Sequence, residues 1–416
     1  PSSGSMPAPV LALEGRQVME GGQGHVTGWG PAFKSSPATA EAERPGWDDL
    51  AVAEEWVKVQ LGRLKKEEAE LEGERQQLEA RKLLHLRELK RQRDEDRSRF
   101  SGRPVLSNRY LLLDLLGKGG FSEVWRAFDL VEFREVACKV HQLNSVWSDE
   151  KKANYTRHAT REYAIHKALH HPRVVRMFDV FEIDMDSFAT VLELCRGTDL
   201  DHMLKEQGCV PEREAKAMLV QLLSALHYLS AEGAEAVAAS GGGSSDPRHT
   251  RRSIIHYDLK PGNILFDEHG ELKITDFGLS KILESAPDTT GMDLTSQGAG
   301  TYWYLPPECF VIGKSPPKIS NKVDVWSVGV IYFQMLFGRR PFGHDQSQEH
   351  LLAQGTILRA TEVQFPATPK ISDEAKAFIR RCLAHRQELR PDMIQLCRDP
   401  YVNGTMAAGK GRSSSA

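Results

Sequence analysis

HYDLKPGNILFDEHGELKITDFG, at residues 256–278, is the stretch of sequence that decides the fold. Two short apolar runs, Ile-Leu-Phe and Leu-Lys-Ile, lie on either side of the turn-forming sequence Asp-Glu-His-Gly. This pattern predicts a β-hairpin, in which two antiparallel strands bring their outer ends together. We therefore expect Asn263 and Asp276 to lie side by side at the open end of the hairpin.

The same stretch carries residues suited to phosphate chemistry. An amide oxygen and a carboxylate that converge, here from Asn263 and Asp276, are hard ligands of the kind that Mg²⁺ prefers. Asp258, five residues before Asn263, can accept the proton of an attacking hydroxyl, and Lys260 can neutralise charge on a transferring group. The sequence therefore predicts a metal-assisted transfer site at this hairpin.

Two motifs further upstream fit a nucleotide site. Gly-Lys-Gly-Gly-Phe-Ser-Glu-Val at residues 117–124 follows a predicted strand, and its glycines allow backbone N–H groups to approach phosphate oxygens. Lys139 follows in the apolar strand sequence Val-Ala-Cys-Lys and needs an anionic partner there. Glu162, on a predicted helix, can supply that partner and leave the ammonium group directed at ligand phosphates.

The order of the predicted elements gives the fold class. Strands are predicted at 110–116, 124–128 and 136–140, a long helix at about 150–169, and mainly helices beyond about residue 211. A β-rich segment followed by a helical one predicts an α+β protein with two lobes, a β-rich N-lobe and a helical C-lobe.

Composition excludes several other classes. The chain has 416 residues, a formal net charge of −3 and 40% hydrophobic residues, so a sizeable core is expected and direct nucleic-acid binding is not. The six cysteines form no C-x-x-C pair and favour a reducing compartment. The most apolar stretch, 325–337, is too short and too interrupted for a membrane span and predicts a buried helix. The sequence begins with Pro1, and we expect it to lie inside a longer protein.

The N-terminal part divides into two predicted segments. Residues 1–46 are rich in Gly, Pro, Ser and Ala and predict a disordered linker. Residues 47–100 contain no proline and are highly charged, which predicts a helix. Val57, Leu64, Leu71 and Leu78 stand seven residues apart, as in a heptad seam, although Glu68 and Arg75 occupy the second apolar position. A self-associating coiled coil and a solvated single helix both remain open.

Two low-complexity segments complete the domain plan. Residues 231–252 predict a flexible insertion within a domain that extends from 105 to 405, and residues 406–416 predict a disordered tail.

This set of motifs resembles the catalytic domain of eukaryotic protein kinases, over about residues 109–402. The resemblance implies binding of ATP and Mg²⁺, with Asn263 and Asp276 as metal ligands. Lys260 and Thr301 are similar to residues of serine/threonine-specific kinases. The resemblance implies a catalytic set that comprises Lys139, Glu162, Asp258, Lys260, Asn263, Asp276 and Thr301.

The resemblance also implies which residues contact the nucleotide. The sequence 192–195 is similar to the kinase hinge, whose backbone at Glu193 and Cys195 would hold adenine, and Asp199 is placed for the ribose. The implied nucleotide-binding positions are Leu116, Gly117, Lys118, Gly119, Gly120, Phe121, Ser122, Glu123, Val124, Ala137, Lys139, Leu192, Glu193, Cys195, Asp199, Leu265 and Asp276.

Further kinase positions have implied structural roles. Arg390 is the expected ion-pair partner of Glu308, and Asp324 is expected to hold the catalytic loop from within the core. Tyr257 departs from the general kinase pattern, where an arginine precedes the catalytic aspartate. Its presence puts control by a phosphorylated activation loop in doubt.

Within the kinases, the chain resembles the Tousled-like family. The resemblance rests on long stretches that include RYLLLDLLG (109–117), IIHYDLKPGN (254–263), LTSQGAGTYWYLPPECF (294–310) and KISNKVDVW (318–326). It implies a nuclear kinase that self-associates through a coiled coil and phosphorylates histone chaperones of the anti-silencing type. The competing hypothesis is a pseudokinase or coiled-coil scaffold that binds nucleotide without turnover.

Overall fold

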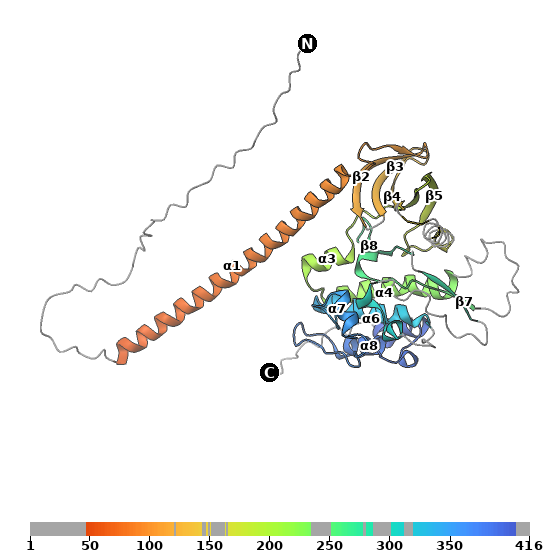
Figure 1. Ribbon diagram of the computed structural model, residues 1–416. Helices are drawn as coiled ribbons and strands as arrows, with labels where there is room; N and C mark the ends of the chain where they lie inside the picture. Colours follow the sequence, from red (N-terminus) through yellow and green to blue (C-terminus); the bar gives the residue numbers. More distant parts are fainter. Residues whose placement is uncertain are drawn as a thin grey trace, which may run out of the picture. The chain divides into compact units, whose positions relative to one another are not determined.

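We describe the protein from a computed structural model, which covers residues 47–119, 122–143, 147–148, 150, 163, 165–233, 251–277, 280–285, 301–311 and 319–404 (Figure 1). The chain divides into two units, residues 1–74 and 75–416. The predicted linker and tail, Gly120, Phe121, Glu162 and most of the predicted 150–169 helix lie outside the described residues.

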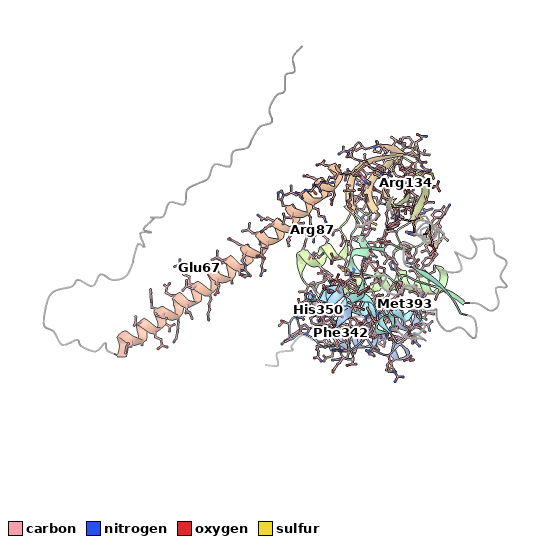
Figure 2. All side chains as sticks on the ribbon, viewed as in Figure 1. Glu67, Arg87, Arg134, Phe342, His350 and Met393 are labelled. Carbon is pink, nitrogen blue, oxygen red and sulfur yellow. The ribbon has the colours of Figure 1, made fainter. Side chains whose placement is uncertain are left out.

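A single helix, α1 (Trp47–Asp96), forms the described part of the first unit and continues into the second. The predicted helix is therefore confirmed. Leu64, Leu71 and Leu78 are 60%, 66% and 62% exposed, and side chains project along the whole helix (Figure 2). A single chain does not test whether this seam pairs with a second copy, so the coiled coil stays a prediction.

The β-rich lobe of the second unit is one antiparallel sheet with the strand order β1-β2-β3-β4-β6-β5. Its apolar side chains form their own core cluster, which includes Leu112, Trp125 and Val136. The strands are β1 (Val105–Leu106), β2 (Tyr110–Lys118), β3 (Ser122–Asp129), β4 (Arg134–Gln142), β5 (Met177–Asp184) and β6 (Ser187–Glu193).

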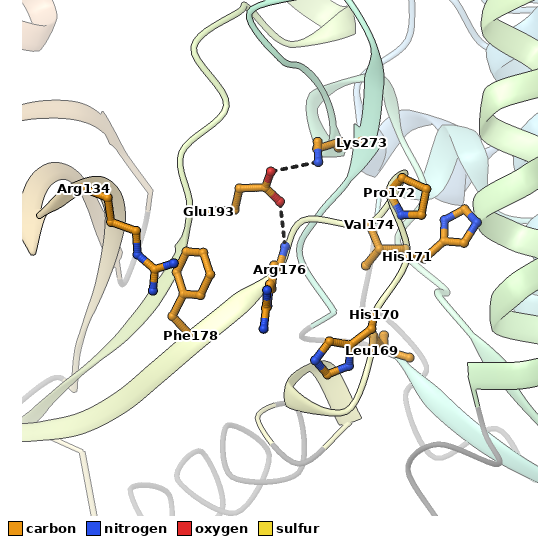
Figure 3. A pocket seen from close by; sticks show the side chains of 10 residues that line it. All are labelled: Arg134, Leu169, His170, His171, Pro172, Val174, Arg176, Phe178, Glu193 and Lys273. Carbon is orange, nitrogen blue, oxygen red and sulfur yellow. Dashed lines mark hydrogen bonds and ion pairs between the residues drawn. The ribbon is translucent and has the colours of Figure 1, made fainter. Parts of the chain in front are cut away.

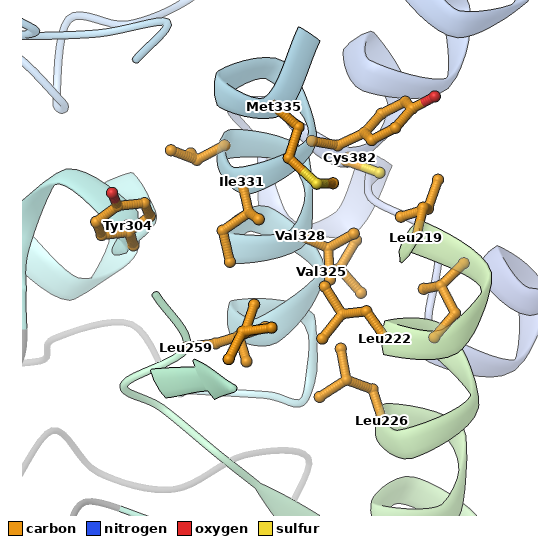
Figure 4. Packing of buried hydrophobic residues seen from close by; sticks show 14 of the residues in the cluster. Leu219, Leu222, Leu226, Leu259, Tyr304, Val325, Val328, Ile331, Met335 and Cys382 are labelled. Carbon is orange, nitrogen blue, oxygen red and sulfur yellow. The ribbon is translucent and has the colours of Figure 1, made fainter. Parts of the chain in front are cut away.

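Helices dominate the other lobe, and their side chains share a second core (Figure 4). The stretch predicted as a buried helix lies within α6 (Lys322–Phe337), which packs against α8 (Asp373–Cys382). Gly329 permits this contact, because a Cβ at that position would lie 2.7 Å from the Cβ of Cys382. The other helices are α3 (Leu200–Gln207), α4 (Glu212–Tyr228), α7 (Gln348–Ala353), α9 (Met393–Cys397) and α10 (Pro400–Asn403).

The predicted hairpin is present as β8 (Ile264–Phe266) and β9 (Leu272–Ile274), preceded by the short helix η2 (Pro261–Asn263). The N-lobe strands, the helical C-lobe and this hairpin confirm the predicted α+β fold with two lobes. None of the helices in the part of the chain described has the length and apolarity needed to cross a membrane.

The ends of the predicted 231–252 insertion belong to ordered elements. Ala231–Gly233 complete the π-helical turn η1 (Leu229–Gly233), and residues 251 and 252 begin β7 (Arg251–Ile255). Strand β7 pairs along its whole length with β10 (Lys281–Ser285). This pairing uses backbone groups, which low-complexity composition does not reveal.

Candidate active site

The open end of the β8–β9 hairpin brings the expected metal ligands together. Ile264 is the register partner of Ile274, and the Thr275 N–H donates to the Asn263 carbonyl at 3.0 Å, which continues the ladder by one step. Asn263 and Asp276 therefore lie on neighbouring strand ends, as the sequence predicts.

Asp258 lies at the centre of a hydrogen-bonded group. Its Oδ2 accepts from the Lys260 ammonium at 2.6 Å and from Asn263 Nδ2 at 3.2 Å. Its Oδ1 accepts from the Thr301 hydroxyl at 3.2 Å. The loop of residues 256–263 and the 301–311 segment thus both contribute side chains that converge on one carboxylate.

A buried aspartate holds this loop from beneath. The Asp324 carboxylate, 3% exposed, accepts from the backbone N–H groups of His256 at 2.8 Å and Tyr257 at 3.0 Å. These bonds support a left-handed backbone at Tyr257 (φ 69°), which is unusual for a side chain of this size. The role expected for Asp324 is confirmed, and the strained turn presents Asp258 directly after it.

Lys139, on β4, forms an ion pair with Asp276 at 2.9 Å. Burial raises the pKa of the Asp276 carboxyl, but the Lys139 charge and hydrogen bond outweigh it and hold this pKa at about 2. Glu162, the predicted partner of Lys139, lies outside the described residues. The contact with Asp276 was not anticipated, because 137 residues separate the partners along the chain.

A cavity of about 580 Å³ opens beside this ion pair. Its volume is within the usual range for small-molecule sites. Most of the predicted nucleotide contacts line it, including four residues of the glycine-rich motif, the hinge and Asp276. Among the predicted residues, those lining the cavity are Leu116, Gly117, Gly119, Ser122, Val124, Ala137, Lys139, Leu192, Glu193, Cys195, Asp199, Asn263, Leu265 and Asp276.

Lys118 and Glu123 were predicted as nucleotide contacts, but their side chains pair with each other at 2.8 Å away from this lining. Alternation along β3 explains the position of Glu123. Ser122 and Val124 face the cavity, so Glu123 between them points to the other face of the sheet.

The cavity also contains residues that the sequence analysis missed, among them Met177, Thr190, Gly197 and His202. None belongs to a short motif, and only the folded sheet brings them to the site. Gly197 has a specific reason to be glycine, because a Cβ there would lie 2.6 Å from the Phe266 carbonyl oxygen.

The side chain of Glu193, in the hinge, contacts Lys273 and Arg176 (Figure 3). The Glu193 carboxylate accepts from the Lys273 ammonium at 2.8 Å and from the backbone N–H of Arg176 at 3.1 Å. Lys273 lies on β9 and Arg176 directly precedes β5, so one carboxylate ties the end of β6 to both lobes.

Two histidine rings flank Phe277, the residue after Asp276. Their ring centroids lie 4.6 Å (His166) and 5.0 Å (His256) from that of Phe277. Burial lowers the pKa of His166 to about 4, and burial also lowers the pKa of His141, which stacks on Phe188, to about 3. Both rings are therefore neutral at pH 7.

We expect these two histidines to make the fold acid-sensitive. Between their folded pKa values and the ordinary value near 6.5, the unfolded chain binds protons that the folded chain does not. The free energy of unfolding should keep its full value above about pH 6.5. Between pH 6.5 and pH 4 it should fall by up to about 1.4 kcal/mol per pH unit for each histidine. Urea unfolding at several pH values measures this slope. His166→Gln should flatten it, whereas His269→Gln, at an exposed position, should not. An equal slope in both variants would show that His166 does not contribute.

The 301–311 segment is anchored by a buried ion pair. Arg390, 1% exposed, donates to the two carboxylate oxygens of Glu308 at 2.7 and 2.6 Å. This two-pronged geometry is the strong form of an arginine–carboxylate contact. It confirms the expected pairing and fixes the segment that carries Thr301.

The donor set at the hairpin fits a magnesium ion. The Asn263 side chain donates through Nδ2 to Asp258, at both its backbone carbonyl (2.9 Å) and its carboxylate, which leaves its amide oxygen for a cation. Asp276 supplies an ionised carboxylate. Within the described residues, no group of three or more His, Cys, Asp or Glu side chains could hold a metal. A pair of protein ligands is typical of Mg²⁺ sites that are completed by phosphate oxygens and water.

Comparisons with known proteins agree with this geometry. A family model for the protein kinase domain matches residues 110–402. Serine/threonine-protein kinase tousled-like 1 of Homo sapiens is 58% identical over 353 residues, which cover 84% of this chain and 44% of that protein. Tousled-like 2 of Mus musculus is 56% identical over 374 residues (89% and 50%). TOUSLED of Arabidopsis thaliana is 53% identical over 363 residues (87% and 50%).

The chain thus spans about half the length of the curated relatives it matches. The matched family region contains strands β2 to β6, the β8–β9 hairpin, the cavity and every residue of the Asp258 group. The chain therefore belongs to the protein kinase domain family, and over most of its length it is similar to Tousled-like serine/threonine kinases.

Proposed function

We propose that this chain transfers the γ-phosphoryl group of ATP to serine or threonine hydroxyls of protein substrates. The observation that carries the proposal is the convergence of Lys260, Asn263 and Thr301 on Asp258, next to the cavity that contains the Lys139–Asp276 ion pair. This arrangement would place a carboxylate that can accept the proton of a hydroxyl beside a cavity suited to nucleotide phosphates and Mg²⁺.

Asp258 orients the attacking hydroxyl and accepts its proton. Its partners fix the carboxylate in place, so little rearrangement is needed when the hydroxyl arrives. The Lys260 ammonium, 2.6 Å from the Asp258 carboxylate, would stabilise the negative charge that develops during transfer. Thr301, whose hydroxyl contacts Asp258, connects the 301–311 segment to the same carboxylate.

The cavity positions the nucleotide. The hinge at residues 192–195 would hold adenine, the glycine-rich turn at 117–124 would cover the phosphates, and Lys139 would contact them. Mg²⁺ held by Asn263 and Asp276 would neutralise phosphate charge. Asp276 and Lys139 lie within ion-pair distance of each other, so the metal ligand and the phosphate contact would act side by side.

A transfer assay with γ-labelled ATP and Mg²⁺ tests this proposal. The chain should label a generic basic protein, and analysis of the phospho-amino acids should give phosphoserine or phosphothreonine. Nucleotide binding without any transfer would instead support the alternative of a pseudokinase or scaffold.

We propose histone chaperones of the anti-silencing type as substrates and the nucleus as the location, on the basis of the similarity to Tousled-like kinases. In the same assay, such a chaperone should be labelled faster than the generic protein at equal concentration. Equal labelling rates for the two proteins would be consistent with the proposed kinase activity but would contradict the proposal that such chaperones are its preferred substrates.

We also propose that the chain forms homo-oligomers through α1. The support is the exposed heptad seam of Leu64, Leu71 and Leu78, which a second helix would cover. Light scattering should give a mass that is a multiple of the chain mass, and Leu64→Lys with Leu71→Lys should reduce it to that of a monomer. Replacing Glu70 and Gln77, which lie on the helix face opposite the seam, with lysine is the matched control. A monomeric wild type would make α1 a solvated spacer.

A further inference from the structure

The end of helix α1 and the turn after it, residues 87–100, make specific contacts with the catalytic domain. We call these residues the collar segment. They lie within the same compact unit as the two lobes, residues 75–416. The family match begins only at residue 110, so the collar segment lies outside it.

The collar segment supplies hydrogen-bond partners for backbone groups at the edge of β2. Strand β1 pairs only with the first two residues of β2, Tyr110 and Leu111, so Leu115 lies beyond its reach. The Leu115 N–H donates to the Glu95 carboxylate at 3.3 Å, and its carbonyl accepts from the Arg91 guanidinium at 3.1 Å. Arg91 and Glu95 also pair with each other at 2.9 Å. One donor and one acceptor thus take the place of a neighbouring strand.

A second contact reaches β3. The Glu123 carboxylate is buried, with 3% of the residue exposed, and accepts from the Ser98 hydroxyl at 2.5 Å. It also accepts from Trp125 Nε1 at 3.2 Å and from the Lys118 ammonium at 2.8 Å. Burial raises the Glu123 pKa, but these three donors outweigh it and lower the pKa overall.

Ser98 is itself held in place. Its Oγ accepts from the Phe100 N–H at 3.1 Å, and the Phe100 ring, 5% exposed, belongs to the core of the β-rich lobe. Ser98 is 6% exposed. The hydroxyl is therefore part of a packed structure and not a surface group that meets Glu123 by chance.

These contacts bracket the glycine-rich turn on both sides. Leu115 lies two residues before Gly117, and Glu123 follows Ser122, which lines the cavity. The Arg87 side chain also contacts His202 on α3, another residue of the cavity lining. The collar segment is thus connected to both strands of the turn and to the helical lobe.

We propose that the collar segment positions the strand residues on either side of the glycine-rich turn, 115–119 and 122–124, several of which line the cavity, with Ser98, Glu123 and Arg91 as positioning residues. The inference rests on the proposed kinase function for its meaning, but its test does not require turnover. A buried carboxylate that loses one of its donors must shift or admit water, and Glu123 is adjacent to a residue that faces the nucleotide. The strand residues that line the cavity should then be held less firmly.

The test compares Ser98→Ala with Ser98→Thr, which keeps the hydroxyl, and with Ser101→Ala, at an exposed position. The Kd for a fluorescent ATP analogue should rise about 3- to 10-fold in Ser98→Ala. It should return most of the way in Ser98→Thr and stay unchanged in Ser101→Ala. Where turnover is measured, KM for ATP should rise similarly while kcat stays within about twofold.

A second variant guards against a trivial loss of folding. Arg91→Met keeps a long side chain at this position but removes the donor to the Leu115 carbonyl. Hydrogen exchange of the 110–119 backbone should become faster in both Arg91→Met and Ser98→Ala. Wild-type nucleotide affinity in both variants would overturn the proposal. A fall in kcat as large as the rise in KM, together with a general fall in thermal stability, would also overturn it. Absence of phosphate transfer in the wild type would refute the kinase function and leave the measured Kd shift intact.

Discussion

Asp258→Asn is expected to bind ATP normally and to lose phosphate transfer by about 10²- to 10⁴-fold. Asparagine has the same shape but cannot accept the hydroxyl proton. Its amide group would also place N–H donors against Lys260 or Asn263, which now donate to the carboxylate. The nucleotide cavity should be unaffected, because Asp258 is not among the residues that line it.

Three measurements check this prediction: the transfer rate, the Kd for nucleotide and the urea midpoint of unfolding. Asp345→Asn is the matched control, since the Asp345 side chain is 88% exposed. The expected pattern is a lost rate with an unchanged Kd and midpoint in Asp258→Asn and no change in the control. A rate within a few fold of wild type in Asp258→Asn would exclude this carboxylate as the catalytic group.

Arg390→Met is expected to destabilise the folded protein by about 3–5 kcal/mol. The substitution leaves the Glu308 carboxylate buried without its partner. It also removes donors from the backbone carbonyls of Ala384, at 2.8 Å, and Lys322, at 3.2 Å. The loss should appear as a lower urea midpoint with an unchanged slope.

The double variant Arg390→Met with Glu308→Leu separates two explanations. Removal of both charges should restore part of the stability, because an apolar pair leaves no buried charge without a partner. Recovery should be incomplete, since the carbonyls that Arg390 contacts stay without a donor. A double variant as unstable as the single one would show that packing around Arg390, and not the ion pair, is the main contribution.

Local sequence patterns predicted much of the fold. The β8–β9 hairpin, strands β2, β3 and β4 and the buried helix α6 each depend on short-range periodicity or turn chemistry, which a sequence displays directly. Strands β1, β5 and β6 were not predicted. The same reasoning placed Asn263 beside Asp276, since a hairpin fixes which residues are neighbours.

Contacts between distant segments could not be predicted in this way. The Lys139–Asp276 pair, the Glu193–Lys273 pair and the Ser98–Glu123 contact each join different elements, and no short motif contains both partners. Glu123 was assigned to the nucleotide because it lies within the glycine-rich motif. Strand alternation instead turns it toward the collar segment.

A single-turnover transfer experiment tests the central claim most directly. The chain is loaded with γ-labelled ATP and Mg²⁺, a protein substrate is added, and the label is followed on serine and threonine for the wild type and Asp258→Asn in parallel. We predict rapid labelling of serine or threonine by the wild type and almost none by the variant, although both bind the nucleotide. Equal labelling by the two proteins, or release of label only as inorganic phosphate whether or not substrate is present, would contradict the account.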